Sequence, residues 1–189
     1  MRSLIVGALL GAVIAFVWQG ISWVALPWHC KSMKKIRNEE FVGWVLKENA
    51  RKDGVYVIPH FDCDGDEQSA SWKESAEQGP YVFASIRTKG IGGSMLSNSV
   101  TSFVMFLILS GIATALLMRT GGLSYVGRVF FVFGIGAISA IVATIPMWNW
   151  FAFPISYTLI NLGDTLITWF LIGLGIAATT PSLPIKKKR

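Results

Sequence analysis

The sequence predicts an all-α membrane bundle of four transmembrane helices, with a small α+β extracytoplasmic subdomain between the first and second helices. Of its 189 residues, 52% are hydrophobic and only 15% are charged, whereas soluble domains carry about 25% charged residues. Residues 3–28, 90–118 and 129–163 contain no Asp, Glu, Lys or Arg. Each segment exceeds the length of about 20 residues that crosses a bilayer as a helix. This composition excludes a soluble globular domain, a disordered chain and a disulfide-rich secreted module.

The apolar stretches and the charges between them set the segment boundaries. The predicted order is transmembrane helix 1 over 1–26, the extracytoplasmic subdomain over 27–95, helix 2 over 96–118, a cytoplasmic turn over 119–126, helix 3 over 127–147, an extracytoplasmic turn over 148–155, helix 4 over 156–178 and a basic cytoplasmic tail over 179–189.

Every predicted transmembrane helix carries small residues four positions apart, which are typical of close helix–helix contacts in lipid. They are Gly7, Gly11 and Ala15 on the first helix, Gly111 and Ala115 on the second, Gly136 and Ala140 on the third, and Gly173 and Ala177 on the fourth. Together they favour a compact bundle, with one face left for a partner.

The distribution of charge predicts the orientation in the membrane. Residues 31–89 hold ten basic and ten acidic side chains, so the net charge of +6 lies elsewhere. The remaining basic residues all flank apolar spans: Arg2, Arg119, Arg128, Lys186, Lys187, Lys188 and Arg189. Because short basic flanks stay in the cytoplasm, both termini are expected there. The excess charge is an orientation signal, so the lipid bilayer is the expected partner and nucleic acid is not.

Asp164 is the only acidic residue within the apolar spans. An isolated carboxylate at the centre of a helix costs roughly 2.5–3.5 kcal/mol on insertion scales. Gln19 falls at a similar depth and Asn161 almost one turn away, with Ser102 and Ser139 close to the same level. We therefore predict an intramembrane polar layer around Gln19, Asn161 and Asp164, without a basic partner. It is either a proton, ion or substrate site, or a hydrogen-bonded knot that fixes helix register.

Aromatic residues gather at the predicted outer boundary, where an interfacial belt commonly anchors helix ends. They are Trp23, Trp28, Trp148, Trp150, Phe151, Phe153 and Tyr157. An aromatic cage or a quinone pocket is the alternative interpretation.

The outer segment contains signals for one helix and two strands. Asn38 is a suitable helix cap, with Glu39 and Glu40 in the first turn. The β-branched and aromatic runs 55–58 and 81–86 predict strands, and an acidic turn over 62–67 lies between them. A segment of this size can bury only a small core.

Both cysteines, Cys30 and Cys63, fall in the outer segment, so an oxidising compartment would permit a disulfide between them. The alternative is an outer-face site made by His29, His60, Asp62, Asp64 and Asp66. Histidine and cysteine are ligands that zinc prefers, but their spacing here matches no standard zinc pattern. The sequence therefore predicts no metal and no cofactor.

Short motifs are spread over the outer segment and all four helices. They are Ser22-Trp23, Leu26-Pro27-Trp28-His29, Asn38-Glu39, Gly54-Val55-Tyr56-Val57-Ile58-Pro59, Leu123-Ser124-Tyr125, Gly127-Arg128, Pro146-Met147-Trp148-Asn149-Trp150-Phe151, Tyr157-Thr158 and Asp164. On these residues the chain resembles a family of uncharacterised bacterial four-helix inner-membrane proteins with a Leu-Pro-Trp-His motif after the first transmembrane helix. The resemblance implies the topology and a bacterial cytoplasmic (inner) membrane location. It implies no substrate or mechanism, and the cysteines are outside the pattern.

The sequence lacks a Gly-rich phosphate loop, a nucleophile elbow and a His-Glu-x-x-His helix. Three hypotheses follow. The first is a non-enzymatic accessory or scaffold subunit that binds a membrane-protein partner or a second copy of itself. The second is a small transporter or channel component that uses Asp164 and Gln19. The third is a membrane enzyme with an extracytoplasmic His and acidic site.

Overall fold

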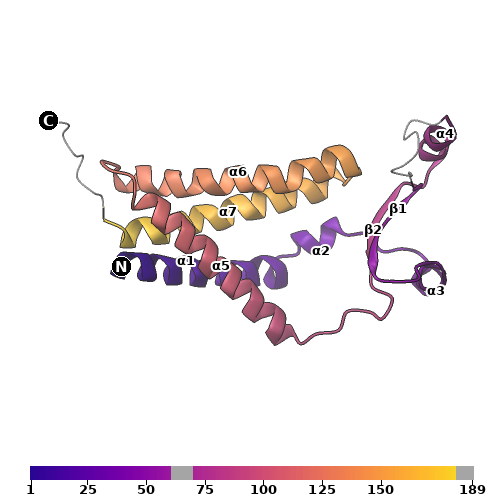
Figure 1. The fold of residues 1–189 in the computed structure, drawn as a ribbon, viewed down its shortest axis with the longest axis horizontal. Coiled ribbons are helices and arrows are strands. Elements are labelled where there is room, and N and C mark those ends of the chain that lie inside the picture. The colour runs from indigo at the N-terminus through magenta and orange to yellow at the C-terminus, as the bar shows by residue number, and fades with distance from the viewer. Residues whose placement is uncertain (61–69, 182–189) are drawn as a thin grey trace. The chain divides into compact units, whose positions relative to one another are not determined.

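The structure is a computed structural model that describes residues 1–60 and 70–181 and divides the chain into two units (Figure 1). One unit, Met1–Lys34 with Ser94–Arg189, contains the long helices, and the other is Lys35–Gly93. The acidic turn predicted over 62–67 and the lysines of the basic tail lie outside the described residues.

The helical unit contains the four predicted apolar helices. Its elements are α1 (Arg2–Gly20), the π-helical turn η1 (Ile21–Ala25), the short α2 (Trp28–Ser32), α5 (Met95–Leu117), α6 (Tyr125–Phe151) and α7 (Ile155–Thr179). The spans Arg2–Ala25, Met95–Leu117, Tyr125–Phe151 and Ile155–Thr179 are each long and apolar enough to cross a membrane. This confirms the prediction of four such helices, of which α7, the helix that carries Asp164, is the least apolar.

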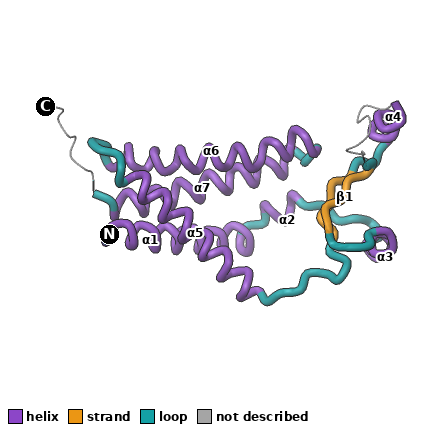
Figure 2. The backbone as a smooth tube through the Cα atoms, in the orientation of Figure 1, coloured by secondary structure: helices purple, strands orange, loops and turns teal. Residues whose placement is uncertain are grey.

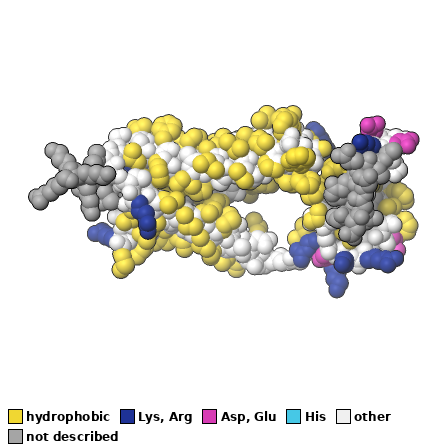
Figure 3. All heavy atoms as spheres, turned by 45° about the horizontal axis from the view of Figure 1, so that its top comes forward, with side chains coloured by type: hydrophobic (Ala, Val, Ile, Leu, Met, Phe, Trp, Pro, Cys, Tyr) yellow, Lys and Arg dark blue, Asp and Glu magenta, His cyan; other side chains and the backbone are white. Residues whose placement is uncertain are grey.

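The helix α7 packs against both α6 and α1, and α1 also packs against α5. Figure 1 shows α6, α7 and α1 running alongside one another, with α5 running obliquely across them. The core between them combines small and aliphatic side chains such as Ala12, Ala15 and Ile172 with the aromatic rings of Phe106 and Trp169. Apolar side chains cover much of the outward surface of this unit in the view of Figure 3. A helix bundle that is apolar both inside and outside is typical of a membrane protein.

Glycines allow the close approach of these helices. A Cβ atom added to Gly7 would lie 2.7 Å from Thr114 of α5, and one added to Gly136 would lie 1.9 Å from Cγ of Trp169 on α7. The predicted small-residue contacts therefore exist at both helix pairs. Gly111 is less constrained, because its added Cβ would meet only the Ala8 side chain, at 3.6 Å.

The helix α6 continues to Phe151, four residues beyond the end predicted at Met147. Pro146 lies inside it and removes a single helical hydrogen bond, because proline lacks the N–H. The chain turns only at Ala152, whose φ of 54° is left-handed, and the N–H of Phe153 donates to Met147 O at 3.2 Å. The predicted turn over 148–155 is thus reduced to residues 152–154.

The second unit contains the predicted helix and strands. They are α3 (Glu39–Asn49), β1 (Gly54–Ile58) and β2 (Val82–Ile86), with the strands antiparallel (Figure 2). Asn38 Oδ1 accepts from the Phe41 N–H at 3.2 Å, which confirms the predicted cap. One further helix, α4 (Ala70–Gln78), was not predicted, because its sequence is mostly polar and lacks an apolar stripe.

Asp53 connects the residue before β1 to the residues that follow β2, at one end of the strand pair. Its Oδ1 accepts from the Thr88 N–H at 2.9 Å and from Thr88 Oγ1 at 3.0 Å, and Arg87 Nε lies 3.7 Å from Oδ2. The backbone hydrogen bond from Thr88, followed by its side-chain hydrogen bond and the Arg87 charge, lowers the pKa of Asp53 from its ordinary value.

Two glycines two residues apart on α6 provide a matched test of helix packing. Gly136→Ala places a methyl group into Trp169, whereas Gly134 has no atom within 4 Å of its added Cβ. We expect Gly136→Ala to lower the free energy of unfolding in detergent micelles by about 1–3 kcal/mol. Gly134→Ala should leave it unchanged or raise it by up to about 1 kcal/mol. Equal stability of the two variants would contradict the α6–α7 packing.

Candidate functional site

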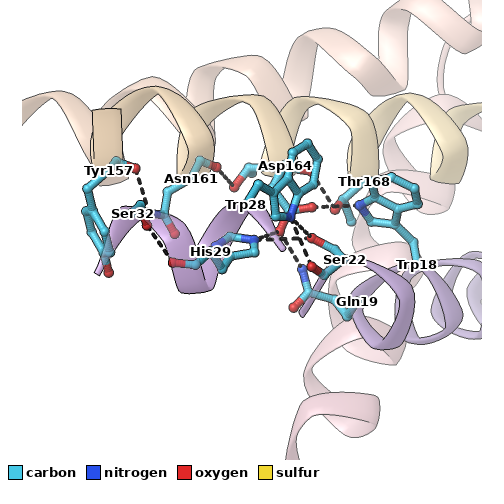
Figure 4. Close-up of polar contacts among 11 residues, drawn as sticks. Trp18, Gln19, Ser22, Trp28, His29, Ser32, Tyr157, Asn161, Asp164 and Thr168 are labelled. Atoms are coloured by element: carbon cyan, nitrogen blue, oxygen red, sulfur yellow. Dashed lines mark hydrogen bonds and ion pairs between the residues drawn. The ribbon is translucent and has the colours of Figure 1, made fainter. Parts of the chain in front are cut away.

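The candidate site is built around Asp164, the tenth residue of α7, which is 4% exposed. Its Oδ1 accepts a hydrogen bond from Trp18 Nε1 at 2.7 Å. Its Oδ2 lies 3.2 Å from His29 Nε2 and, as a weaker contact, 3.5 Å from Gln19 Nε2 (Figure 4). The two oxygens of the buried carboxylate therefore face three groups that can donate hydrogen bonds.

An irregular stretch after α1 brings His29 back to α7. The helix widens into the π-helical turn η1, in which the Leu26 N–H donates to Ile21 O at 3.0 Å. Leu26 is extended, and Pro27 then caps the five-residue α2, which packs on α7. Single π-helical turns occur frequently at functional sites, and this one reorients the chain so that His29 is 2% exposed.

Two tryptophans contact the imidazole, and a third packs behind one of them. Trp23 stacks on His29 with ring centroids 3.8 Å apart and planes 8° from parallel, and Trp28 meets it edge-on at 5.7 Å. Trp28 in turn packs edge-on against Trp18 at 6.2 Å, and its Nε1 donates to Ser22 O at 2.9 Å. Trp23 and Trp28, which the sequence assigned to an interfacial belt, thus form part of the site.

The three residue types Ser22, His29 and Asp164 do not form a catalytic triad. In a triad the serine and the carboxylate use opposite nitrogens of the histidine. Here Ser22 Oγ and Asp164 Oδ2 both lie 3.2 Å from the same atom, Nε2, and Nδ1 is buried without a hydrogen-bond partner. The arrangement cannot activate Ser22 while Asp164 orients the ring.

Polar residues continue from Asp164 along one face of α7. Figure 4 shows Tyr157, Asn161, Asp164 and Thr168 on this face. Asn161 Nδ2 donates to Tyr157 O at 2.8 Å and Thr168 Oγ1 to Asp164 O at 2.8 Å, so both bond within their own helix. Of the predicted polar layer, the structure brings Gln19 to Asp164 but gives Asn161 no bond to that carboxylate.

A cavity of about 300 Å³ lies beside the N-terminal part of this face. It is lined by Ala143, Thr144, Met147, Phe153, Tyr157, Thr158 and Asn161. The cavity thus offers hydroxyl and amide groups among apolar walls, between α6 and α7.

The other predicted site residues belong to the second unit or lie outside the described residues, apart from Cys30. His60 is exposed in the second unit, and Asp62, Cys63, Asp64 and Asp66 lie outside the described residues. Cys30 is a free, exposed thiol, so the structure forms no disulfide there. Within residues 1–60 and 70–181, no group of three or more His, Cys, Asp or Glu side chains could hold a metal ion.

His29 is the partner of Asp164, whereas no basic partner was predicted for that carboxylate. His29 follows the first apolar span, so it was grouped with the outer segment. The available signal was the motif Leu26-Pro27-Trp28-His29, in which a proline turn precedes a histidine among tryptophans.

No protein-family profile, no curated protein and no solved structure matches this chain. The four helices indicate a multi-pass membrane protein. The residues Trp18, Gln19, Ser22, His29 and Asp164, whose side chains meet at the buried carboxylate and imidazole, are called the Asp164 cluster below.

Substitution of Asp164 tests the energetic role of the cluster. In Asp164→Asn one of the two oxygens is replaced by an NH₂ group, which donates hydrogen bonds. This group then faces either Trp18 or the pair Gln19 and His29, where an acceptor is needed. We expect the free energy of unfolding in detergent to fall by about 2 kcal/mol. The matched control is Thr165→Val, since Thr165 Oγ1 bonds only Asn161 O of its own helix at 2.9 Å, and it should change stability by less than about 0.5 kcal/mol. Equal values for both variants would show that the cluster adds nothing to stability.

Proposed function

We propose that this protein is a non-enzymatic accessory or scaffold subunit of a membrane complex. The observation that supports this proposal is the engagement of Asp164 by its own chain. A carboxylate that serves as a transport site has to meet its ion, whereas both oxygens of Asp164 face donors from Trp18, Gln19 and His29. Such a contact fixes the register of α1 and α2 against α7.

The proposed location is the bacterial cytoplasmic membrane, with both termini in the cytoplasm. Arg2 begins α1, Arg119 follows α5 and Arg128 lies in the first turn of α6, while residues 182–189 add four more cations. These charges lie before the first span, between the second and third spans, and after the fourth, which is one and the same side for a chain that crosses the membrane four times. Short basic flanks of this kind remain cytoplasmic. The outer segment then faces the extracytoplasmic side. The bacterial assignment rests on the resemblance carried by Leu26-Pro27-Trp28-His29.

One face of α6 is available for binding a partner of the proposed scaffold. Phe130, Ile138 and Val142 are 58%, 68% and 68% exposed, and Gly134 opens a notch beside them. Small residues next to such ridges let helices approach closely in lipid. A membrane-protein helix or a second copy of this chain fits this surface.

Purification in mild detergent tests the scaffold role. We expect the tagged chain to be recovered with a stoichiometric partner or as a homo-oligomer, measured by native mass spectrometry. Gly134→Leu fills the notch on α6 and should reduce the recovered partner at least about tenfold, the equivalent of 1.4 kcal/mol. Gly163→Leu, on α7 and equally open, is the control and should leave the partner bound. A strictly monomeric chain would contradict the proposal.

The second candidate is a small transporter or channel component. The polar face of α7 and the cavity beside Tyr157 and Asn161 favour it. A single four-helix chain encloses little space, so this function requires an oligomer. A membrane enzyme has no such support, because His29 is buried against Asp164 and their geometry with Ser22 is not that of a triad.

Flux measurements in liposomes separate the two candidates. For a scaffold, proton or ion flux should equal that of empty liposomes, with the wild type and with Asp164→Asn alike. Flux that is present in the wild type and in Thr165→Val but lost in Asp164→Asn would establish transport through the Asp164 cluster and overturn the scaffold assignment.

A further inference from the structure

We propose that the Asp164 cluster is a reversible proton-binding site, and that the proton binds at Nδ1 of His29. This inference does not depend on the scaffold role, because a proton can bind without being transported and with or without a partner subunit.

The first observation is that a buried nitrogen lacks a partner. His29 is 2% exposed, and its Nδ1 makes no hydrogen bond. The other ring nitrogen, Nε2, is shared by Ser22 and Asp164. Most buried polar atoms are hydrogen-bonded, so each exception requires an explanation. A nitrogen with an unused lone pair is the atom of an imidazole that accepts a proton.

The second observation is the charge that surrounds this ring. Trp18, Gln19 and His29 present donors to Asp164, which suits an ionised carboxylate because that group only accepts. Arg128 does not neutralise it, since its guanidinium donates to Leu123 O and Ala177 O, both at 3.3 Å. With a neutral His29 the cluster carries one negative charge, and with a protonated His29 it carries none. A low-dielectric interior favours the paired state.

Few other titratable groups face the ring from the elements packed against it. The last turn of α1 and η1 contain none, and α7 contributes Asp164 and Tyr157. On α2 itself, Cys30 and Lys31 are exposed. Asp164 is therefore the charged group that decides whether His29 holds the proton.

The chemistry is a single proton transfer. A hydronium ion or a buffer acid gives up its proton, the Nδ1 lone pair forms the new N–H bond, and the Nε2–H remains directed at Asp164. On release the proton returns to water. The indole of Trp23, stacked at 3.8 Å, stabilises the protonated ring further, because an aromatic face attracts a cation.

Nitrogen NMR of the full-length protein in lipid nanodiscs tests this inference. The chain contains two histidines, so His60→Asn with ¹⁵N-labelled histidine leaves His29 as the observed residue. Between about pH 9 and about pH 5, where histidine charge is commonly decided, the Nδ1 signal should change reversibly from the unprotonated to the protonated form. In Asp164→Asn the protonated signal should be lost over the same range, because a buried cation would be unpaired. Thr165→Val lies outside the cluster, because Thr165 Oγ1 bonds Asn161 O of its own helix, and it should retain the transition.

A purely structural His29 would stay in one protonation state over this range. That result in the His60→Asn protein, in which the Asp164 cluster is unchanged, would by itself overturn the inference, whatever the other variants do. An unchanged transition in Asp164→Asn would overturn it as well, because the proton would then be held without the carboxylate. Circular dichroism of each variant identifies any that fails to fold. The titration of the protein that carries only His60→Asn then decides whether His29 binds a proton, without the failed variants.

Discussion

The burial of one carboxylate in an apolar helix bundle is the constraint that shapes the helical unit. Placing Asp164 on α7 removes it from water, and such a group is tolerated only when donors replace the solvent. The end of α1 supplies Trp18 and Gln19, and α2 supplies His29. The π-helical turn and the short helix after Pro27 therefore bring the third donor, His29, to the carboxylate.

The parts of the fold that sequence reasoning predicted are those coded by nearby residues. The spans follow from stretches without charge, because an apolar stretch of about 20 residues is typical of a helix that crosses a bilayer. The Asn38 cap and the strand pair follow from local chemistry in the same way. The end of α6 was predicted wrongly, because a proline inside a long apolar helix costs one hydrogen bond and need not end the helix. The polar helix α4 carries no apolar stripe that could have revealed it.

The site was predictable only in part, because it joins residues far apart in the chain. Asp164 and Gln19 could be matched by depth along straight helices. His29 could not, since it lies 135 positions before Asp164 and reaches it through an irregular turn rather than along a helix axis. The contact of Trp23 with the imidazole was missed for the same reason: an aromatic residue near a helix end suits an interface, and only the turn directs Trp23 onto His29.

The positions of the donors along the chain also bear on biosynthesis. Trp18, Gln19 and His29 are all translated before α5, α6 and α7, and the carboxylate they contact lies in α7. Since chains are synthesised from the N-terminus onward, the groups that donate to Asp164 exist before Asp164 does. If the carboxylate were synthesised first, it would lack all three donors until the rest of the chain followed.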